Sequence, residues 1–275
     1  MSESGSERGE SGGATSLTAL VRRPGADLSA CELTHLEREP VDALRAAQQH
    51  AAYVTALREL GVQVTELEPL DGHPDALFVE DCALVLDEIA VLCRPGVASR
   101  RGEVASLEPH LALHRELVHI EEPGTLEGGD LVVIEGVVHV GWSGRTNHAG
   151  LKMLAHLLLE HGYLVKAAEV HGCLHLKSAL SHLGDGRVLA NRHWANLERV
   201  RASEVLEVDP SEPFGANVLK VGEILLCSAS YPRTNQRLSA AGYELRVLEL
   251  DELHKMEAAV TCPSLVFRKL QTLSP

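Results

Sequence analysis

Residues 130–170 read DLVVIEGVVHVGWSGRTNHAGLKMLAHLLLEHGYLVKAAEV, and this stretch decides the fold. Two short apolar runs at its start, Asp130–Ile134 and Val137–Val140, predict two strands. Apolar residues then recur at helical spacing and predict a core-facing helix near Thr146–Glu160. The stretch closes with Leu164–Val170, which predicts a third strand. These residues therefore predict one strand–strand–helix–strand module.

The same order of elements recurs along the chain. Further helices are expected near Arg100–Leu113, Trp194–Ala202 and Pro232–Ala241. Each lies between apolar runs that predict strands, and one of these runs is Leu176–Leu180. The matching points of the copies are, in order, Asp81, Asp130, Ser178, Asn217 and Cys262, separated by 49, 48, 39 and 45 residues. A period of this size favours radial repetition, as in propellers, over an ordinary α/β sheet with coincidental spacing.

The two ends of the chain supply the remaining module. Leu17–Val21 and Val62–Leu67 predict strands, and a helix near Pro40–Leu60 between them ends at Gly61, a residue well suited to the position after a helix. A final strand is expected at Thr261–Phe267. If the modules surround an axis, the start of every first strand points towards one centre, so distant residues can form one site.

Composition excludes several classes of function. The net charge is −14 and aromatic residues make up 3%, which argues against a nucleic-acid surface, because that needs basic and stacking side chains. The N-terminus lacks an apolar signal segment, and no apolar run approaches a membrane span. Six widely spaced cysteines without a CxxC pair favour reduced thiols and a cytoplasmic protein. Residues 1–15 are rich in Gly, Ser and Glu and predict a disordered tail, followed by a single domain at 16–275.

A thiol, an imidazole and a carboxylate stand at three of the converging positions. Cys262, His175 and Glu127 are the parts of a nucleophilic cysteine site. The alternatives are a buried structural cysteine, a hydrogen-bonded core histidine and a solvated turn glutamate. The pair Gly128-Gly129 leaves space beside the carboxylate. Pro263 lacks a strand N–H and favours a strand edge that opens on a cavity.

Two neighbouring acids, Glu80 and Asp81, follow an apolar run, so at least one is expected to be half-buried. A buried carboxylate needs a partner or a cation, which makes a cationic ligand a natural partner. Zinc is an alternative reading of His171, Cys173 and His175, which alternate along the chain. A closed zinc site needs four ligands, however, and no fourth ligand is evident.

Several arginines flank these segments. Arg94 and Arg145 are expected on loops, where a guanidinium group suits bidentate binding of a carboxylate. Solvated loop charges are the alternative for both. Arg100 and Arg101 are expected to open a helix and to lie on the surface.

Taken together, these segments resemble one family. They are residues 74–81 (PDALFVED), 94–101 (RPGVASRR), 125–130 (TLEGGD), 144–147 (GRTN), 174–178 (LHLKS) and 260–267 (VTCPSLVF). In this order, and over residues 16–270, the chain resembles the dimethylarginine dimethylaminohydrolase (DDAH) family of the guanidino-group-modifying superfamily. The resemblance implies a five-bladed, pseudo-symmetric α/β propeller, the pentein fold. Pro263 departs from the usual pattern after the nucleophile.

The resemblance also implies roles for single residues. Cys262 would be the nucleophile, His175 the acid and base, and Glu127 the carboxylate near the histidine and the guanidinium. The implied substrate-binding residues are Glu80 and Asp81 at the guanidinium, Asp75, Arg94 and Arg145 at the amino-acid end, Phe78, Leu33 on a lid at 25–40, and Met256 through its backbone carbonyl.

The activity implied by the resemblance is hydrolysis of N-ω-methylated L-arginine to citrulline and methylamine or dimethylamine, through a covalent thiouronium on Cys262. No metal and no organic cofactor are expected, and a homodimer is left open as an alternative to a monomer. Three rivals also stay open. They are an arginine deiminase-like or other amidinohydrolase, a catalytically silent binding member, and the zinc-binding protein.

Overall fold

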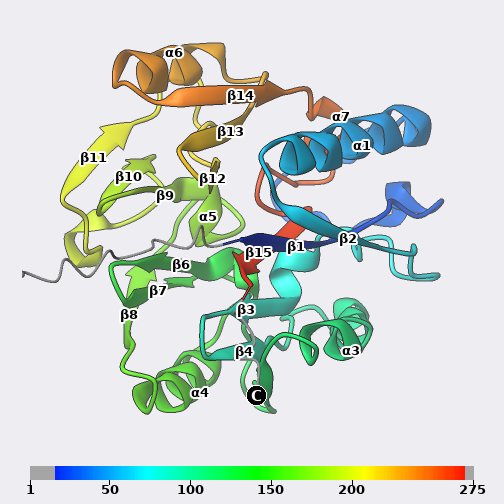
Figure 1. The fold of residues 1–275 in the computed structure, drawn as a ribbon, viewed down its shortest axis with the longest axis vertical. Helices are drawn as coiled ribbons and strands as arrows, with labels where there is room; N and C mark the ends of the chain where they lie inside the picture. The colour runs from blue at the N-terminus through cyan, green and yellow to red at the C-terminus, as the bar shows by residue number, and fades with distance from the viewer. Residues whose placement is uncertain (1–15, 270–275) are drawn as a thin grey trace, which may run out of the picture.

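The computed structural model describes residues 16–269, so the tail predicted at 1–15 lies outside the described residues. Sheets of three strands surround a common centre, with helices on the outside of the ring (Figure 1). Four of the five sheets follow one another in the chain: β3 (Ala83–Val85), β4 (Ile89–Leu92) and β5 (Glu116–His119); β6 (Leu131–Ile134), β7 (Val137–Trp142) and β8 (Leu164–Glu169); β9 (Leu180–Gly184), β10 (Arg187–Ala190) and β11 (Glu204–Glu207); β12 (Leu219–Val221), β13 (Ile224–Ser228) and β14 (Glu244–Leu248).

The fifth sheet joins the two ends of the described chain. It contains β1 (Leu17–Arg22), β2 (Gln63–Leu67) and β15 (Ser264–Arg268). β15 pairs antiparallel with β1, with Leu20 opposite Leu265, and β1 pairs parallel with β2. This pairing closes the ring, and the predicted five-bladed α/β propeller is confirmed.

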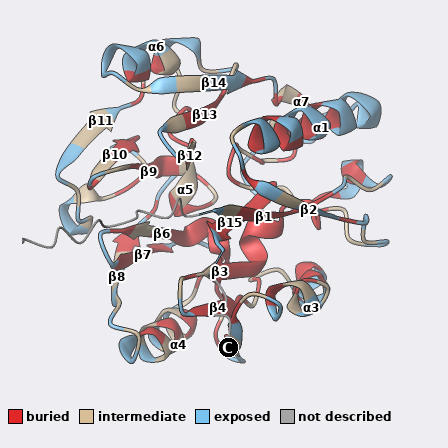
Figure 2. Ribbon diagram, in the orientation of Figure 1, coloured by how far each residue is buried: buried red, intermediate tan, exposed pale blue. Residues whose placement is uncertain are grey.

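All five sheets share one connectivity. The inner strand of each sheet is antiparallel to the middle strand, and the middle strand is parallel to the outer one. The middle strands β1, β4, β7, β10 and β13 are almost entirely buried, whereas the outer strands carry exposed residues (Figure 2). The core therefore lies around the middle strands, and the inner strands face the axis.

Helices cover the outside of most modules, and local sequence sets their ends. α1 (Ala43–Glu59) begins where the Asp42 side chain accepts a hydrogen bond from the Arg45 N–H, and it is followed by Gly61 at φ +81°. α4 (His148–Leu159) is capped in the same way by Asn147. α6 (Pro232–Ala240) starts with proline, whose missing N–H costs nothing in a first turn. No helix of residues 16–269 is long and apolar enough to cross a membrane.

Two helix predictions were wrong in extent. The helix expected at 100–113 is divided into α2 (Arg101–Ala105) and α3 (Glu108–Leu111), because Pro109 cannot donate a hydrogen bond to a preceding turn. The helix expected at 194–202 is reduced to a single 3-10 turn, η5 (Leu197–Arg199). An antiparallel bridge between Val170 and Ala195 holds this segment against β8 and overrides its helical pattern.

Short helical turns precede the inner strands of three modules. They are η2 (Val79–Cys82) before β3, η4 (Gly128–Asp130) before β6 and α5 (Leu176–Ala179) before β9. The strand predicted at 176–180 was therefore wrong, since β9 starts only at Leu180. The repeat markers nevertheless lie one or two residues before the inner strands, as expected for the entry points of equivalent modules.

Candidate active site

The predicted catalytic residues and the guanidinium-binding Asp81 lie at these entry points or in the residues directly before them. Asp81 lies within η2, Glu127 directly precedes η4, and His175 directly precedes α5. Cys262 lies in a turn two residues before β15. Because the inner strands face one axis, four segments far apart in sequence bring these groups together.

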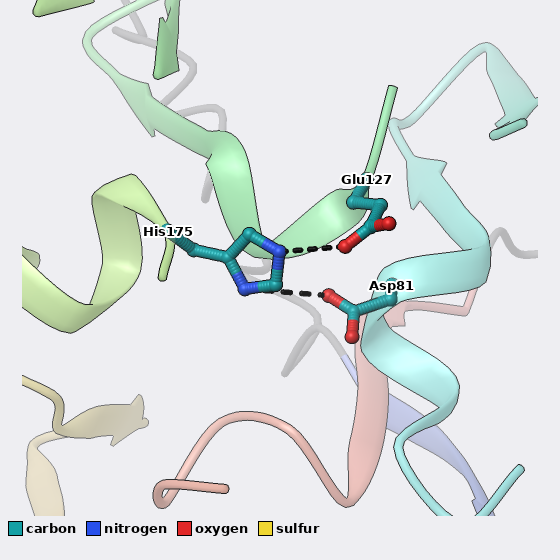
Figure 3. A group of neighbouring side chains, drawn as sticks. All are labelled: Asp81, Glu127 and His175. Carbon is teal, nitrogen blue, oxygen red and sulfur yellow. Dashed lines mark hydrogen bonds and ion pairs between the residues drawn. The ribbon is translucent and has the colours of Figure 1, made fainter. Parts of the chain in front are cut away.

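His175 lies between two carboxylates (Figure 3). Its Nε2 is 2.7 Å from Glu127 Oε2, and its Nδ1 is 3.9 Å from Asp81 Oδ1. Burial alone would lower the pKa of His175, but the Asp81 charge and the Glu127 hydrogen bond outweigh it and raise the pKa to about 9. The imidazole is therefore protonated at neutral pH and can act as a proton donor.

Arg100 is the principal correction to the sequence predictions. It was expected on the surface but is 4% exposed, with Nη1 2.7 Å from Asp81 Oδ2 and Nη2 2.9 Å from Glu103 Oε2. Burial would raise the pKa of Asp81, but His175 and Arg100 outweigh it and lower the pKa to about 2. Asp81 therefore remains charged beside the histidine. Arg101, by contrast, is exposed as predicted.

Replacing Arg100 with methionine should destabilise the protein by about 3–5 kcal/mol, because Asp81 and Glu103 would remain buried without their cation. Urea unfolding measures the free energy of unfolding. The matched control is Arg101→Met, which removes the same charge from an exposed position and should cost no more than about 0.5 kcal/mol. Equal losses for the two variants would contradict the internal role of Arg100.

Glu127 is fully buried and held on both oxygens. Its Oε1 accepts a hydrogen bond from the Gly96 N–H at 3.0 Å and lies 3.5 Å from Arg145 Nη1, while Oε2 faces His175. Burial would raise the pKa of Glu127, but its contact with His175 lowers it. The carboxylate therefore stays ionised and fixes the orientation of the imidazole ring.

The pair Gly128-Gly129 is required for close approach. A Cβ atom on Gly128 would collide with the Glu80 backbone carbonyl, and one on Gly129 would lie 2.5 Å from His175 Nδ1. Neither glycine has a positive φ. The two glycines therefore allow close approach of the Glu80 backbone and of the His175 ring, whereas space beside the Glu127 carboxylate itself stays a prediction.

Asp130 ties the histidine segment to its neighbours. It is fully buried, and it accepts hydrogen bonds from the hydroxyls of Ser143 and Thr146, both at 2.6 Å, and from the Leu176 N–H at 3.0 Å. Since Leu176 follows His175, this carboxylate fixes the backbone that carries the imidazole.

Cys262 differs from the other cysteines. Cys31, Cys82, Cys93, Cys173 and Cys227 are buried, whereas Cys262 is partly exposed. Its Sγ accepts a hydrogen bond from the Ala259 N–H at 3.3 Å. Burial, followed by the charges of Glu80 and Asp81, raises the pKa of this thiol well above its ordinary value. A cation in the adjoining space would reverse this effect and favour the thiolate.

That space is a small cavity. The volume open to the centre of a water molecule is about 20 Å³. Its lining contains predicted residues from each part of the site: Asp75, Phe78, Asp81, Arg145, His175, Met256 and Cys262. Sequence reasoning missed Glu32, Arg100, Glu257 and Ala258, which complete the lining with Leu174. Four carboxylates line the cavity with two guanidinium groups and the protonated His175, so negative charges still outnumber positive ones and favour a cation.

Three predicted substrate-binding residues do not line the cavity. Leu33 packs against a hydrophobic cluster that includes Leu28 and Cys31 of the same segment. Arg94 donates to the Gly124 carbonyl and pairs with Glu122 at 3.1 Å. Glu80 pairs with Lys177. Direct contact of these three with a substrate stays a prediction.

The predicted lid at residues 25–40 covers the cavity in this structure. Both oxygens of Asp75 accept from the Glu32 N–H, and Thr34 Oγ1 accepts from Arg145 Nη2 at 2.8 Å. The Glu257 carboxylate accepts from three consecutive backbone N–H groups of the lid, at Thr34, His35 and Leu36. No motif in the sequence marks Glu257, because its partners lie more than 200 residues away.

The zinc alternative built on residues 171–175 is wrong. Among the described residues, one group of three possible ligands comes together, Asp81, Glu127 and His175, and it includes neither His171 nor Cys173. The Cys173 thiol instead donates to the His175 carbonyl, and His171 is exposed. Asp81 and Glu127 are already paired with arginines, as described above.

Comparison with known proteins agrees with this geometry. The family model described as N,N dimethylarginine dimethylhydrolase, eukaryotic, matches residues 34–190. A DDAH from Streptomyces coelicolor is 40% identical over 253 residues, covering 92% of this chain and 97% of that protein. The chain belongs to the DDAH family. A DDAH from Pseudomonas aeruginosa is 32% identical over 228 residues, covering 82% of this chain and 90% of that protein.

Solved structures of DDAH extend the match to three dimensions. A cysteine-to-serine variant of the P. aeruginosa DDAH, complexed with citrulline, superposes with a TM-score of 0.86 at 30% identity and covers 92% of this chain and 99% of that chain. The N-terminal domain of ArgZ, a cyanobacterial arginine dihydrolase, gives a TM-score of 0.83 at 20% identity, covering 92% and 97%. At that identity the ArgZ match shows the shared fold alone.

Proposed function

We propose that this protein hydrolyses N-ω-methylated L-arginine to L-citrulline and methylamine or dimethylamine. One observation carries the proposal: in a DDAH-family chain, a partly exposed thiol and a protonated histidine line one small cavity whose charge balance is acidic. A methylated arginine has a cationic head that suits this balance. The family relationship supplies the choice of methylated arginine.

Binding places the two ends of the substrate on different charged groups. Asp81 lines the cavity and would hold the guanidinium beside Cys262, whereas Glu127 does not line the cavity and would act through His175; both carboxylates stay ionised. Arg145 would pair with the α-carboxylate, and Asp75 would face the α-amine. Met256 lines the cavity and could offer its backbone carbonyl there. Closure of the lid then excludes water from the charged groups, which strengthens their interactions.

The first half of the reaction forms a carbon–sulfur bond. The bound guanidinium lowers the pKa of Cys262, so the thiol releases its proton to solvent and the substrate helps to generate the thiolate. The thiolate attacks the guanidinium carbon, and His175 gives its proton to the departing amine as the carbon–nitrogen bond breaks. A covalent thiouronium on Cys262 and a free methylamine or dimethylamine result, with His175 left neutral.

The second half releases the enzyme. Neutral His175 removes a proton from a water molecule, and the hydroxide attacks the same carbon. The carbon–sulfur bond then breaks, the thiolate leaves, and the new hydroxyl group releases its proton to solvent and becomes the carbonyl of citrulline. His175 thus protonates the departing amine and deprotonates the attacking water, and the residues named here provide the nucleophile, acid and base.

Citrulline release from asymmetric dimethylarginine, monomethylarginine and arginine, compared by kcat/KM, tests the proposal. We expect the methylated substrates to exceed arginine by at least about tenfold. A preference for arginine would instead identify an arginine deiminase-like enzyme. If none of the three substrates is turned over, the result would favour a catalytically silent binding protein.

Replacing Arg145 with alanine should raise KM about 10–100-fold with a smaller change in kcat, because a charge-assisted pair with the α-carboxylate is lost. Steady-state kinetics measure the two constants separately. Arg187→Ala, an arginine on β10 outside the cavity, is the control and should leave KM unchanged. A change confined to thermal stability would contradict the binding role. The same assay on Arg94→Ala decides whether Arg94 contributes.

A further inference from the structure

A second ionic group lies beneath the site and has no part in the mechanism above. Glu80 Oε1 is 2.6 Å from Lys177 Nζ, and Glu80 Oε2 accepts a hydrogen bond from Thr261 Oγ1 at 2.6 Å. The Glu80 side chain is 6% exposed and that of Lys177 is 23% exposed. We call Glu80, Lys177, Thr261 and Asn217 the floor.

The floor separates two cavities. Glu80, Lys177 and Thr261 line a second cavity of about 590 Å³ that runs along the inner strands, and none of the three lines the substrate cavity. Their chain neighbours Asp81 and Cys262 line the substrate cavity instead. The wall between the two spaces is therefore about one residue thick at these positions.

Hydrogen bonds connect the floor to the backbone of the nucleophile. The Glu80 N–H donates to the Cys262 carbonyl at 3.3 Å, and the Thr261 N–H donates to Asn217 Oδ1 at 3.0 Å. The Asn217 amide group in turn donates to Thr261 Oγ1 and to the Lys177 carbonyl, both at 3.0 Å. Segments from three other modules thus support the turn that carries Cys262.

The charges of the floor act on the thiol in opposite directions. The Glu80 carboxylate raises the pKa of Cys262, and the Lys177 ammonium lowers it. With Lys177 in place, the negative charge of Glu80 beneath the thiol is partly neutralised. Without it, the buried Glu80 carboxylate would have no cation of its own.

We propose that Lys177 is a positioning residue for the nucleophile: through its ion pair with Glu80 it fixes the Thr261–Cys262 turn and offsets the negative charge beneath the sulfur. This inference rests on the proposed role of Cys262. It also assigns Glu80 to the floor rather than to direct contact with the guanidinium.

The test is the rate of Cys262 alkylation by iodoacetamide as a function of pH, with the modified residue identified by mass spectrometry. In Lys177→Met the pH profile of alkylation should shift to higher pH by roughly one unit, because a nearby positive charge is lost. The reaction at pH 8 should then be about tenfold slower. In Glu80→Gln the profile should move in the opposite direction, since the amide side chain would keep the Thr261 hydrogen bond but carry no charge. The double variant should return close to the wild type.

Two controls isolate the charge. Lys177→Arg keeps the charge and should keep the profile. Lys220→Met removes a lysine that lines the same second cavity but pairs with the exposed Glu223, and it should not move the profile. Glu80→Gln retains a hydrogen-bonding side chain and is expected to fold even if Lys177→Met does not.

Three results separate the possibilities. Variants that lose thermal stability without opposite shifts of the alkylation profile would overturn the positioning role. A rise of more than about tenfold in KM for Glu80→Gln, with an unchanged profile, would overturn it in favour of direct substrate contact. If wild-type Cys262 resists alkylation and no citrulline forms, the proposed function itself fails.

Discussion

Replacing Cys262 with serine should lower citrulline formation by at least about 10⁴-fold, because a hydroxyl group is a far weaker nucleophile than a thiolate at neutral pH. The only hydrogen-bond donor to the sulfur among the described residues is the Ala259 N–H, and no base contacts it to activate a serine. The change is nearly isosteric, so the free energy of unfolding should move by less than about 1.5 kcal/mol. Citrulline assays and urea unfolding measure the two effects.

The control for this variant is another thiol. Cys227 is fully buried in β13, away from the substrate cavity, and Cys227→Ala should cost stability but retain kcat. Intact-mass measurement after addition of substrate should detect a covalent adduct in the wild type and none in Cys262→Ser. Serine-variant activity above about 1% of wild type would exclude Cys262 as the nucleophile.

Replacing His175 with glutamine should lower kcat by about 10²–10⁴-fold, since the same imidazole serves as acid and then as base. Activity that depends on the protonated form should fall as pH rises through about 9, the pKa set by burial opposed by Asp81 and Glu127. His171→Gln, an exposed histidine in the same segment, is the matched control and should leave both kcat and the pH profile unchanged.

The same histidine predicts how stability depends on pH. Its pKa is about 9 in the folded protein against an ordinary 6.5, so the folded state binds more protons between these values. The stabilising contribution is thus fully present below about pH 6.5 and is lost as pH rises through about 9. Urea unfolding across this range should show the decline in the wild type and a weaker one in His175→Gln. Parallel curves would contradict the charged His175.

The repeat made much of this fold predictable from sequence. Its period located the entry points of the modules to within one or two residues, because each module must start its inner strand at the same distance from the axis. It also predicts that Glu127, His175 and Cys262 converge on one centre. Two local exceptions could not be predicted from the repeat. Pro109 divides one expected helix, and the bridge at Ala195 replaces most of another.

The charged partners were harder to predict than the reacting groups. Arg100 was expected on the surface because it and Arg101 were expected to open a helix, but the fold turns Arg100 towards Asp81. Glu80 and Asp81 are adjacent in sequence, yet they face different cavities. Side-chain direction within a 3-10 turn follows from tertiary packing, which no local pattern encodes.

The pairing of β15 with β1 has a consequence for biosynthesis. A ribosome produces Glu127 and His175 well before Cys262, and the thiol takes its place only when the last strand docks beside the first. Until then the nascent polypeptide carries an acid and a base without a nucleophile. Catalytic competence therefore arrives in one late step, at the moment when the ring is completed.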